Sequence, residues 1–362
     1  MKLISHVGRV AAARVTAALL VIGAMPAWAV PDVLERPSAP SAKAAGAVML
    51  GITQAGARLV AVGERGIVLY SDDAGAHWRQ AAVPVSVSLV GARFLNQKDG
   101  WAVGHSGVLL RTGDGGKSWT KHLDGTAAAR LVVTAVSEGR LPPGADPARA
   151  QADAERLVAE GPSKPFFDIH FFDDRNGLLI GAFGLALATS DGGATWRAAL
   201  ERFDNPKAKH LYAIAADGDA CVIAGEQGAV FYSSDRGRSF RALATPYEGT
   251  YFGAIAAGPR TVVFGMRGNV YWSETPGGAW RKSDIATTQS LTAGLRLQDG
   301  SLLLTDETGR LFRSTDGGRS FQPQAGATGA PLTGAVQSAD GTLFVSGVRG
   351  VTKIALPSPQ GQ

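Results

Sequence analysis

Six related octets recur along the chain, and their spacing strongly limits the folds available to it. All but one follow the pattern [S/T]-x-D-x-G-x-x-[W/F]: SDDAGAHW (71–78), TGDGGKSW (112–119), TSDGGATW (189–196), SSDRGRSF (233–240), SETPGGAW (273–280) and STDGGRSF (314–321). The closing aromatic residues are separated by 41, 77, 44, 40 and 41 residues. A period of about 40–45 residues is typical of one four-stranded propeller blade. The spacing of 77 predicts one period with an insertion of about 36 residues.

A hairpin pattern precedes each octet, with two short apolar runs on either side of a glycine-containing turn. Such punctuation between β-branched and aliphatic runs predicts paired strands. A further apolar run, such as LYAIAA (211–216), precedes each unit, so each repeat reads strand, strand, strand, octet, strand. The seven units are LVAVGERGIVLY (59–70), GWAVGHSGVLLR (100–111), GLLIGAFGLALA (177–188), CVIAGEQGAVFY (221–232), TVVFGMRGNVYW (261–272), SLLLTDETGRLF (301–312) and TLFVSGVRGVTK (342–353).

Seven hairpins and six octets leave the last repeat without a fourth strand. The β-type stretch PDVLERP (31–37) has no other assigned place. A closed propeller removes the exposed sheet edges of an open array. We therefore predict an all-β, seven-bladed β-propeller over residues 30–362, in which a strand at about 32–36 completes blade 7, with Val33 and Leu34 beside 350–356. An open repeat array and six blades with a frayed tail are the alternatives.

The octets are expected to be structural turns between the third and fourth strands. Asp and Ser/Thr side chains accept hydrogen bonds from backbone N–H groups a few residues on, and glycine supplies a positive φ. The closing Trp or Phe can bury about 150–250 Å² between neighbouring sheets. The residues concerned are Asp73, Asp114, Asp191, Asp235 and Asp316, with Trp78, Trp119, Trp196, Phe240, Trp280 and Phe321. In the fifth octet Thr275 replaces the acid.

The octet resembles the Asp box of bacterial-neuraminidase repeats, which sialidases, xyloglucan-cleaving glycosidases and many non-enzymatic propellers share. The stretches 58–78, 161–196 and 210–219 are similar to exported bacterial relatives of the photosystem II stability/assembly factor family. This resemblance implies a non-enzymatic scaffold that acts on a membrane-protein complex. Because relatives in non-photosynthetic bacteria are often encoded beside RND-type exporters, such an exporter is the other implied partner.

The N-terminus has the pattern of a secretory signal peptide. Lys2, Arg9 and Arg14 precede the apolar run VTAALLVIGAM (15–25) and the A-x-A site at 27–29. We expect residues 1–29 to be removed after Ala29 and the protein to be periplasmic or otherwise exported; an uncleaved anchor is the alternative. Of the net charge of +5, these three residues supply three, which leaves +2 and argues against a nucleic-acid partner. The single cysteine, Cys221, allows no internal disulfide, and a monomer is expected.

An Asp-box glycoside hydrolase is the alternative function. Such enzymes need two carboxyl groups about 5–10 Å apart across one cleft. The candidate acids are Glu64, Asp168, Glu226, Glu248 and Glu307, which fall on different blades. The Arg-Ile-Pro signature that precedes the first Asp box of sialidases is absent. No two histidines have metal-ligand spacing, and there is no phosphate loop or dinucleotide glycine pattern, so neither metal nor cofactor is expected.

A binding surface is expected where the turns between second and third strands gather on one face. We call this face the rim. It would display Arg65, His105, Phe183, Gln227, Arg267, Thr308 and Arg349, and the connections between blades would add Asp168, His210, Glu248 and Tyr251. The three arginines could hold an acidic segment or a terminal carboxylate through paired hydrogen bonds. Ordinary turn charges, and for Tyr251 a packed strand position, are the alternatives.

The insertion at about 123–165 lies between blades 2 and 3. The segments 126–139 and 146–161 both read as helices. In the second, Asp146 suits the N-cap, Pro147 the first turn and Gly161 the C-terminal stop. Two interpretations stay open: a helical hairpin packed against the propeller, and a docking arm for a partner.

Overall fold

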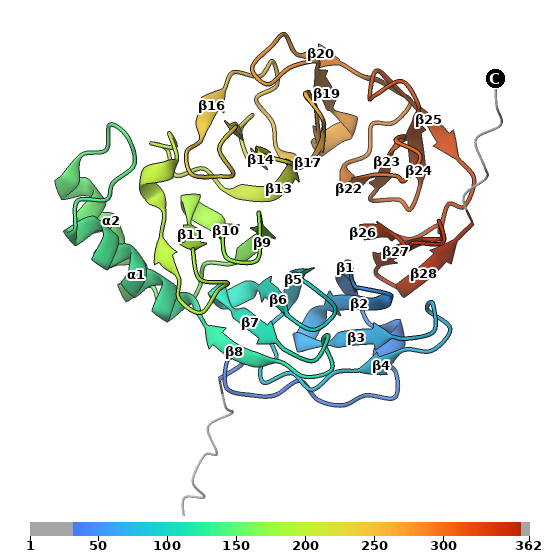
Figure 1. Ribbon diagram of the computed structural model, residues 1–362, viewed down its shortest axis with the longest axis horizontal. Coiled ribbons are helices and arrows are strands. Elements are labelled where there is room, and N and C mark those ends of the chain that lie inside the picture. Colours follow the sequence, from blue (N-terminus) through green and yellow to red (C-terminus); the bar gives the residue numbers. More distant parts are fainter. Residues whose placement is uncertain (1–31, 356–362) are drawn as a thin grey trace, which may run out of the picture. The chain divides into compact units, whose positions relative to one another are not determined.

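Each repeat forms a short antiparallel sheet whose first strand lies nearest the centre of a ring. In the computed structural model, which describes residues 32–355, seven such sheets surround a central axis, and the predicted seven-bladed β-propeller is confirmed (Figure 1). The second strands of blades 2, 3, 6 and 7 are buried along their whole length. Sheets cover both of their faces, which is why these strands read as continuous apolar runs rather than alternating ones.

The strands of each blade follow one another from the centre outward. Blades 1–3 comprise β1 (Met49–Ala55), β2 (Arg58–Gly63), β3 (Val68–Ser71) and β4 (Arg79–Gln80); β5 (Leu89–Phe94), β6 (Gly100–Gly104), β7 (Leu109–Thr112) and β8 (Thr120–Leu123); β9 (Phe166–Phe171), β10 (Gly177–Gly181), β11 (Ala186–Thr189) and β12 (Arg197–Ala198). Blades 4–7 comprise β13 (Leu211–Asp217), β14 (Ala220–Gly225), β15 (Val230–Ser233) and β16 (Arg241–Leu243); β17 (Tyr251–Ala257), β18 (Arg260–Gly265), β19 (Val270–Ser273) and β20 (Arg281–Lys282); β22 (Leu291–Arg296), β23 (Leu302–Asp306), β24 (Leu311–Ser314) and β25 (Ser320–Gln324); β26 (Leu332–Gln337), β27 (Leu343–Gly347) and β28 (Gly350–Ile354).

The octets close the turns between third and fourth strands through one repeated set of hydrogen bonds. In the third octet the Thr189 hydroxyl donates to Asp191 Oδ1 (2.7 Å), the same carboxylate oxygen accepts from the Thr195 N–H (2.9 Å), and the Gly193 N–H donates to the Thr189 hydroxyl (2.9 Å). Four other octets repeat this set. In the fifth, the Ser273 hydroxyl donates instead to the Thr275 carbonyl (2.8 Å). The octet is therefore a turn of the fold.

The closing aromatic residues lie between adjacent blades, as predicted. Trp119 packs in the cluster shared by blades 1 and 2, Phe240 in that of blades 3 and 4, and Phe321 in that of blades 5 and 6. The apolar cluster between blades 6 and 7 contains no octet aromatic and consists of aliphatic residues such as Leu303, Leu343 and Ile354.

The chain also links neighbouring blades as it leaves each fourth strand. Ala82 forms a parallel bridge with Ser118, and Phe203 forms one with Phe240. Between blades 5 and 6 the link is a strand, β21 (Asp284–Ile285), which pairs in parallel with β25. In each case the connection contacts the last strand of the next blade beside its octet aromatic.

The prediction that residues 32–36 complete blade 7 is wrong. Within the described residues blade 7 has three strands, in the order β26-β27-β28. Residues 33–36 form a turn, and Leu34 packs with Val83, Val85 and Trp119 against blades 1 and 2. The Ser86 N–H donates to the Val33 carbonyl (2.8 Å), and Lys121 donates to the Leu34 carbonyl (3.2 Å). Leu34 thus occupies an apolar site beside blades 1 and 2 instead of a strand position on blade 7.

Direct packing of blade 7 against blade 1 closes the ring (Figure 1). The Thr333 hydroxyl on β26 donates to the Met49 carbonyl on β1 (2.7 Å). A methyl group on Gly75, in the first octet, would lie 2.8 Å from a ring carbon of Phe344 on β27, so this glycine and this ring are in contact. The short helix η1 (Ala44–Gly46) covers the start of β28, where a methyl on Gly350 would strike the Ala45 carbonyl.

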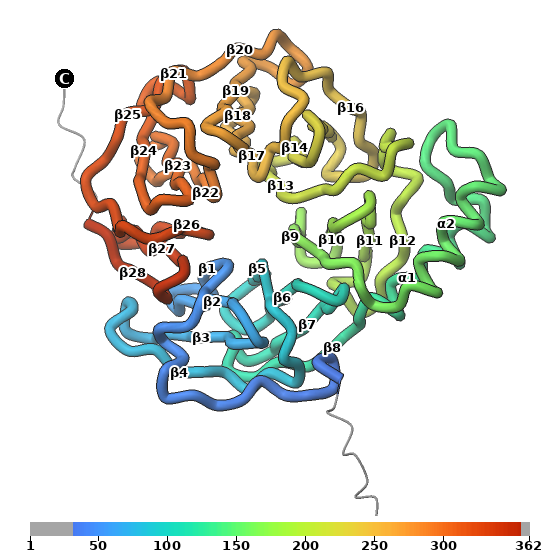
Figure 2. The backbone as a smooth tube through the Cα atoms, turned by 180° about the vertical axis from the view of Figure 1, so that it is seen from behind, coloured from blue at the N-terminus to red at the C-terminus, as the bar shows by residue number. Residues whose placement is uncertain are grey.

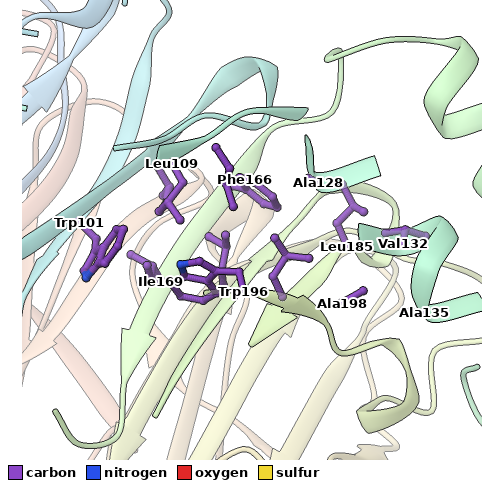
Figure 3. Close-up of a cluster of buried hydrophobic side chains, with 14 of the residues drawn as sticks. Trp101, Leu109, Ala128, Val132, Ala135, Phe166, Ile169, Leu185, Trp196 and Ala198 are labelled. Carbon is purple, nitrogen blue, oxygen red and sulfur yellow. The ribbon is translucent and has the colours of Figure 1, made fainter. Parts of the chain in front are cut away.

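The insertion folds as the two predicted helices, α1 (Gly125–Ser137) and α2 (Pro147–Ala159), on the outside of blade 3 (Figure 2). Asp146 caps α2 through the Arg149 N–H (2.7 Å). Figure 3 shows Val132 of α1 approaching Leu185 and Ala198, in the cluster that also contains Trp101 and Trp196. Helix α2 packs on α1, and its Val158 is 41% exposed. For α1, the packed interpretation holds.

No helix in residues 32–355 has the length and apolar character needed to span a membrane. The predicted signal peptide and its cleavage after Ala29 lie outside the described residues.

Candidate functional site

The rim turns of blades 1–5 present five side chains in one unusual backbone conformation, and four of the five are exposed. Arg65, Ser106, Phe183, Gln227 and Arg267 occupy equivalent positions with φ between 50° and 57°. Four of the turns are short 3-10 segments: η2 (Glu64–Gly66), η3 (His105–Gly107), η4 (Ala182–Gly184) and η6 (Met266–Gly268). Left-handed conformations are uncommon for residues other than glycine. Four different residue types occupy this position in the five turns. The fold therefore does not dictate which side chain is displayed there.

The three rim arginines are solvent-exposed. Within residues 32–355, Arg65, Arg267 and Arg349 form no ion pair with a carboxylate. The structure places them on blades 1, 5 and 7, as predicted. Since blades 7 and 1 are adjacent, Arg65 and Arg349 lie on neighbouring blades, with Arg267 two blades from Arg349.

Three glutamates in the same turns are held by backbone groups. Glu64 Oε1 accepts from the Val48 N–H (3.1 Å), Glu226 Oε1 from the His210 N–H (2.8 Å) and Glu307 Oε1 from the Ser290 N–H (2.8 Å). Each glutamate therefore ties its rim turn to the segment entering the inner strand of the same blade. Their role in the fold explains their presence beside the arginines.

His105 and His210 differ in their surroundings. His105 is exposed at the tip of blade 2, as predicted. His210 accepts a hydrogen bond at Nδ1 from the Phe183 N–H (2.9 Å), and its ring lies 4.7 Å from that of Phe183. Phe183 is 54% exposed, and the Lys164 ammonium lies 4.8 Å from its ring centroid.

An aromatic arc extends this pair toward the central axis. We define it as Phe167, Phe183, His210, Tyr212 and Phe252. The ring centroids of Phe167 and Tyr212 are 5.0 Å apart, and those of Tyr212 and Phe252 are 5.9 Å apart. Phe167, Tyr212 and Phe252 share the second position of the inner strands of blades 3, 4 and 5. The sequence analysis did not single out these three, although aligning the repeats would have placed aromatic residues in that one column.

Two predicted contact residues have structural positions. Tyr251 is fully buried, at the strand position that Met49, Leu89, Phe166, Leu211, Leu291 and Leu332 occupy in the other blades. Its side chain therefore does not reach the rim surface. Asp168 also lies on an inner strand, where its carboxylate accepts backbone N–H groups from Ile169 and Ile214. Burial raises the pKa of Asp168, and the nearby Arg93, which the sequence analysis missed, opposes that rise.

The chain matches one known protein family over most of its length. A family model described as "Photosynthesis system II assembly factor YCF48" matches residues 69–138 and 155–328, more than half of the chain. The chain belongs to this family. A curated relative, the photosystem II assembly lipoprotein Ycf48 of Synechococcus sp. (strain CC9902), is 26% identical over 160 residues, which cover 42% of this chain. The match spans 47% of that relative's length, or about half.

Three solved propellers, two of them named YCF48, share the fold. YCF48 bound to a D1 peptide aligns with a TM-score of 0.63 at 14% identity, over 87% of this chain and 95% of that one. YCF48 from Cyanidioschyzon merolae gives 0.62 at 16% identity, over 87% and 96%. The WD40 propeller domain of Doa1 gives 0.60 at 9% identity, over 90% and 97%. At these identities the likeness establishes the propeller architecture.

The matching family is described as an assembly factor and not as a glycoside hydrolase. The candidate acids Glu64, Glu226 and Glu307 lie on blades 1, 4 and 6 and bind backbone N–H groups. Asp168 is committed to two backbone N–H groups, and Glu248 is an exposed residue of the connection to blade 5. Among residues 32–355, no three His, Cys, Asp or Glu side chains are grouped as metal ligands.

Proposed function

We propose that the chain is an exported, non-enzymatic assembly scaffold whose rim binds an acidic segment of a membrane-protein complex. The observation that carries this proposal is the contrast in the rim between cations and anions. Arg65, Arg267 and Arg349 point their charge at solvent without an ion pair among the described residues, whereas the neighbouring glutamates are bound to backbone N–H groups.

The chemistry of the rim suits a carboxylate-bearing peptide. Guanidinium groups bind carboxylates through two parallel hydrogen bonds, which adds direction to the charge attraction. The aromatic arc supplies apolar contact area on blades 3–5, where Phe183 is the most exposed member. A segment with acids and apolar side chains could therefore contact both sectors of the same face.

The family supports a membrane-protein partner. One solved relative is bound to a D1 peptide, and the curated relative is named as a photosystem II assembly lipoprotein. We propose a corresponding complex, or an RND-type exporter, as the partner of this chain, with the propeller acting as a periplasmic monomer after cleavage at Ala29. The only cysteine in the sequence is Cys221, which is buried on β14.

Capture from detergent-solubilised envelope tests the proposal. The mature chain is immobilised, and retained proteins are identified by mass spectrometry at low and high salt. Arg65→Glu combined with Arg349→Glu is expected to abolish capture of one defined membrane complex, and high salt is expected to weaken capture by the native chain because exposed charges are screened.

The matched control reverses two charges on the opposite face. Lys117→Glu with Arg238→Glu changes two exposed cations in octet turns by the same total charge. This variant is expected to retain capture, and both double variants are expected to keep the native melting temperature. Equal loss in the two variants would reduce the effect to net charge, and unchanged capture by the rim variant would refute the rim as the binding face.

A further inference from the structure

The outer edge of blade 7 differs from that of every other blade. Six sheets have a fourth strand outside the third, whereas β28 is the outermost strand of blade 7 within the described residues (Figure 1). A strand at a sheet edge presents unpaired N–H and C=O groups in alternation, which an added strand can pair. Helix η1 covers only the start of β28, at Gly350.

A groove lies beside this edge. It has a volume of about 470 Å³ and lies between the connection from blade 6 and β28, with Gly326, Thr328, Val345, Thr352 and Ile354 among its lining residues. The corresponding connections from blades 1, 3 and 5 pair with blades 2, 4 and 6 at or just before the last strand. Within the described residues, the connection at 325–331 has no such strand to meet, so the groove lies at the position that a fourth strand would take.

The groove also lacks the side chain that an octet would deliver. Octet aromatic residues pack against the apolar clusters between the other pairs of blades, as Trp78 does between blades 7 and 1 and Trp280 between blades 4 and 5. Between blades 6 and 7 the cluster is aliphatic and ends at Ile354 on β28. An incoming strand could therefore place an aromatic side chain where the other blades place theirs.

The positive charge around the groove favours an acidic segment as its ligand. Arg349 and Lys353 line it, and none of its lining residues is acidic. A second copy paired through its own β28 would bring like charges together, which is unfavourable across a strand pair. Residues 356–362, LPSPQGQ, carry no acid and no aromatic residue, and their two prolines cannot donate to a strand ladder.

We propose that the open edge of blade 7 binds an extended segment of a partner chain, in which one aromatic side chain is flanked by acidic residues. The segment pairs with β28 and completes the blade, with its aromatic ring in the position of the missing octet residue. This strand-addition site is separate from the proposed rim function and shares only Arg349 with it.

Peptide binding tests the site directly. The probe is the fluorescein-labelled peptide TEVWEVT, measured by fluorescence anisotropy together with hydrogen exchange of the β28 amides. Binding is expected to slow exchange at 351–354, and replacing the Trp by Ala or both Glu by Lys is expected to weaken binding about tenfold. Lys353→Glu is expected to weaken binding of the acidic peptide and to strengthen binding of the Lys-containing peptide. Arg267→Glu on the rim is expected to leave the affinity for both peptides unchanged.

A second variant fills the edge in the same chain. Residues 356–362 are replaced by the octet and fourth strand of blade 6, STDGGRSFQPQ, in which the octet itself supplies the turn. This addition is expected to raise Tm and to prevent binding of the peptide. Replacing its Phe by Ala is expected to reverse much of the rise in Tm. Such a result supports the site even where the rim proposal fails.

Three outcomes would overturn the inference. The first is no protection of residues 351–354 by the probe combined with no rise in Tm from the added strand. The second is faster exchange at 351–354 after deletion of residues 356–362, which would mean that the chain's own tail fills the edge. The third is a concentration-dependent dimer that Lys353→Glu disrupts, which would make a second copy the occupant.

Discussion

The Asp168 carboxylate on the inner strand of blade 3 accepts a hydrogen bond of 2.8 Å from the Ile214 N–H on the inner strand of blade 4. Its other oxygen accepts from the Ile169 N–H, also at 2.8 Å. The equivalent position in the other six blades is Gly or Ala, at residues 51, 91, 213, 253, 293 and 334. Asp168 is therefore a specific link between two blades near the axis.

Asp168→Ala is expected to destabilise the propeller by about 2–5 kcal/mol. The substitution leaves two backbone N–H groups without their acceptor, at about 1–3 kcal/mol each when buried. The free energy of unfolding in urea measures this loss. Asp204→Ala, at an exposed position without such bonds, serves as the control and is expected to change stability little; equal stability of the two variants would contradict the link.

The octet carboxylates should make the fold sensitive to acid. The Thr195 hydroxyl, together with backbone and Thr189 hydrogen bonds, lowers the pKa of Asp191 from 3.8 to about 2. Hydrogen bonds from the His77 backbone and side chain likewise lower the pKa of Asp73. Because the folded pKa lies below the unfolded one, the stabilisation is present above the unfolded pKa and is lost as the pH falls toward 2.

Urea unfolding across pH 2–6 tests this expectation. Asp191→Asn is expected to be less stable than the native chain at pH 6. It is also expected to lose less stability between pH 5 and 2, because it lacks one carboxylate that takes up a proton on unfolding in acid. Thr275→Ala is the control, because the fifth octet closes on the Thr275 backbone carbonyl and has no carboxylate at the position of Asp191. An unchanged pH slope in Asp191→Asn would contradict the assignment.

Two glycines with similar backbone angles should differ in their tolerance of a methyl group. Gly193 has a φ of 84°, and a methyl there would lie 2.3 Å from the Trp101 ring, whereas Gly218, at 61°, has no neighbour within 4 Å. Gly218→Ala is expected to cost about 1 kcal/mol from the left-handed backbone alone. Gly193→Ala is expected to cost about 1–3 kcal/mol more through displacement of Trp101. Calorimetry measures both losses, and near-UV circular dichroism should change only for Gly193→Ala.

A substitution that weakens the seam between blades 7 and 1 should cause local unfolding at that seam. Phe344→Ala removes a buried ring that contacts Gly75 across the seam, and Phe312→Ala removes an equally buried ring from the cluster between blades 5 and 6. Both are expected to cost about 3–5 kcal/mol. Hydrogen exchange should rise in β1 and β27 for Phe344→Ala and in β23 and β24 for Phe312→Ala; a uniform rise in both variants would exclude local opening at the seam.

The repeat made most of the fold predictable, because each octet and each rim turn is closed by residues within a few positions of one another. The place of Leu34 depends on contacts with Val83 and Trp119, residues distant in the sequence, and no local pattern indicates them. The site was partly predictable. The exposed rim arginines follow from the turn positions, and the burial of Tyr251 follows from its alignment with Leu89 and Leu211. The backbone partners of Glu64 and Glu226 required the geometry.

The octet turns and the rim turns lie at opposite ends of each blade, and this separation has an evolutionary consequence. Substitutions of the octet Asp, Gly or closing aromatic residue threaten folding, whereas the rim tips already carry Arg, Ser, Phe and Gln on one backbone geometry. Single substitutions at the rim tips can therefore change the binding partner without affecting the residues that stabilise the fold. Divergence between relatives should accordingly concentrate at the tips, and orthologues serving different envelope machines should differ there first.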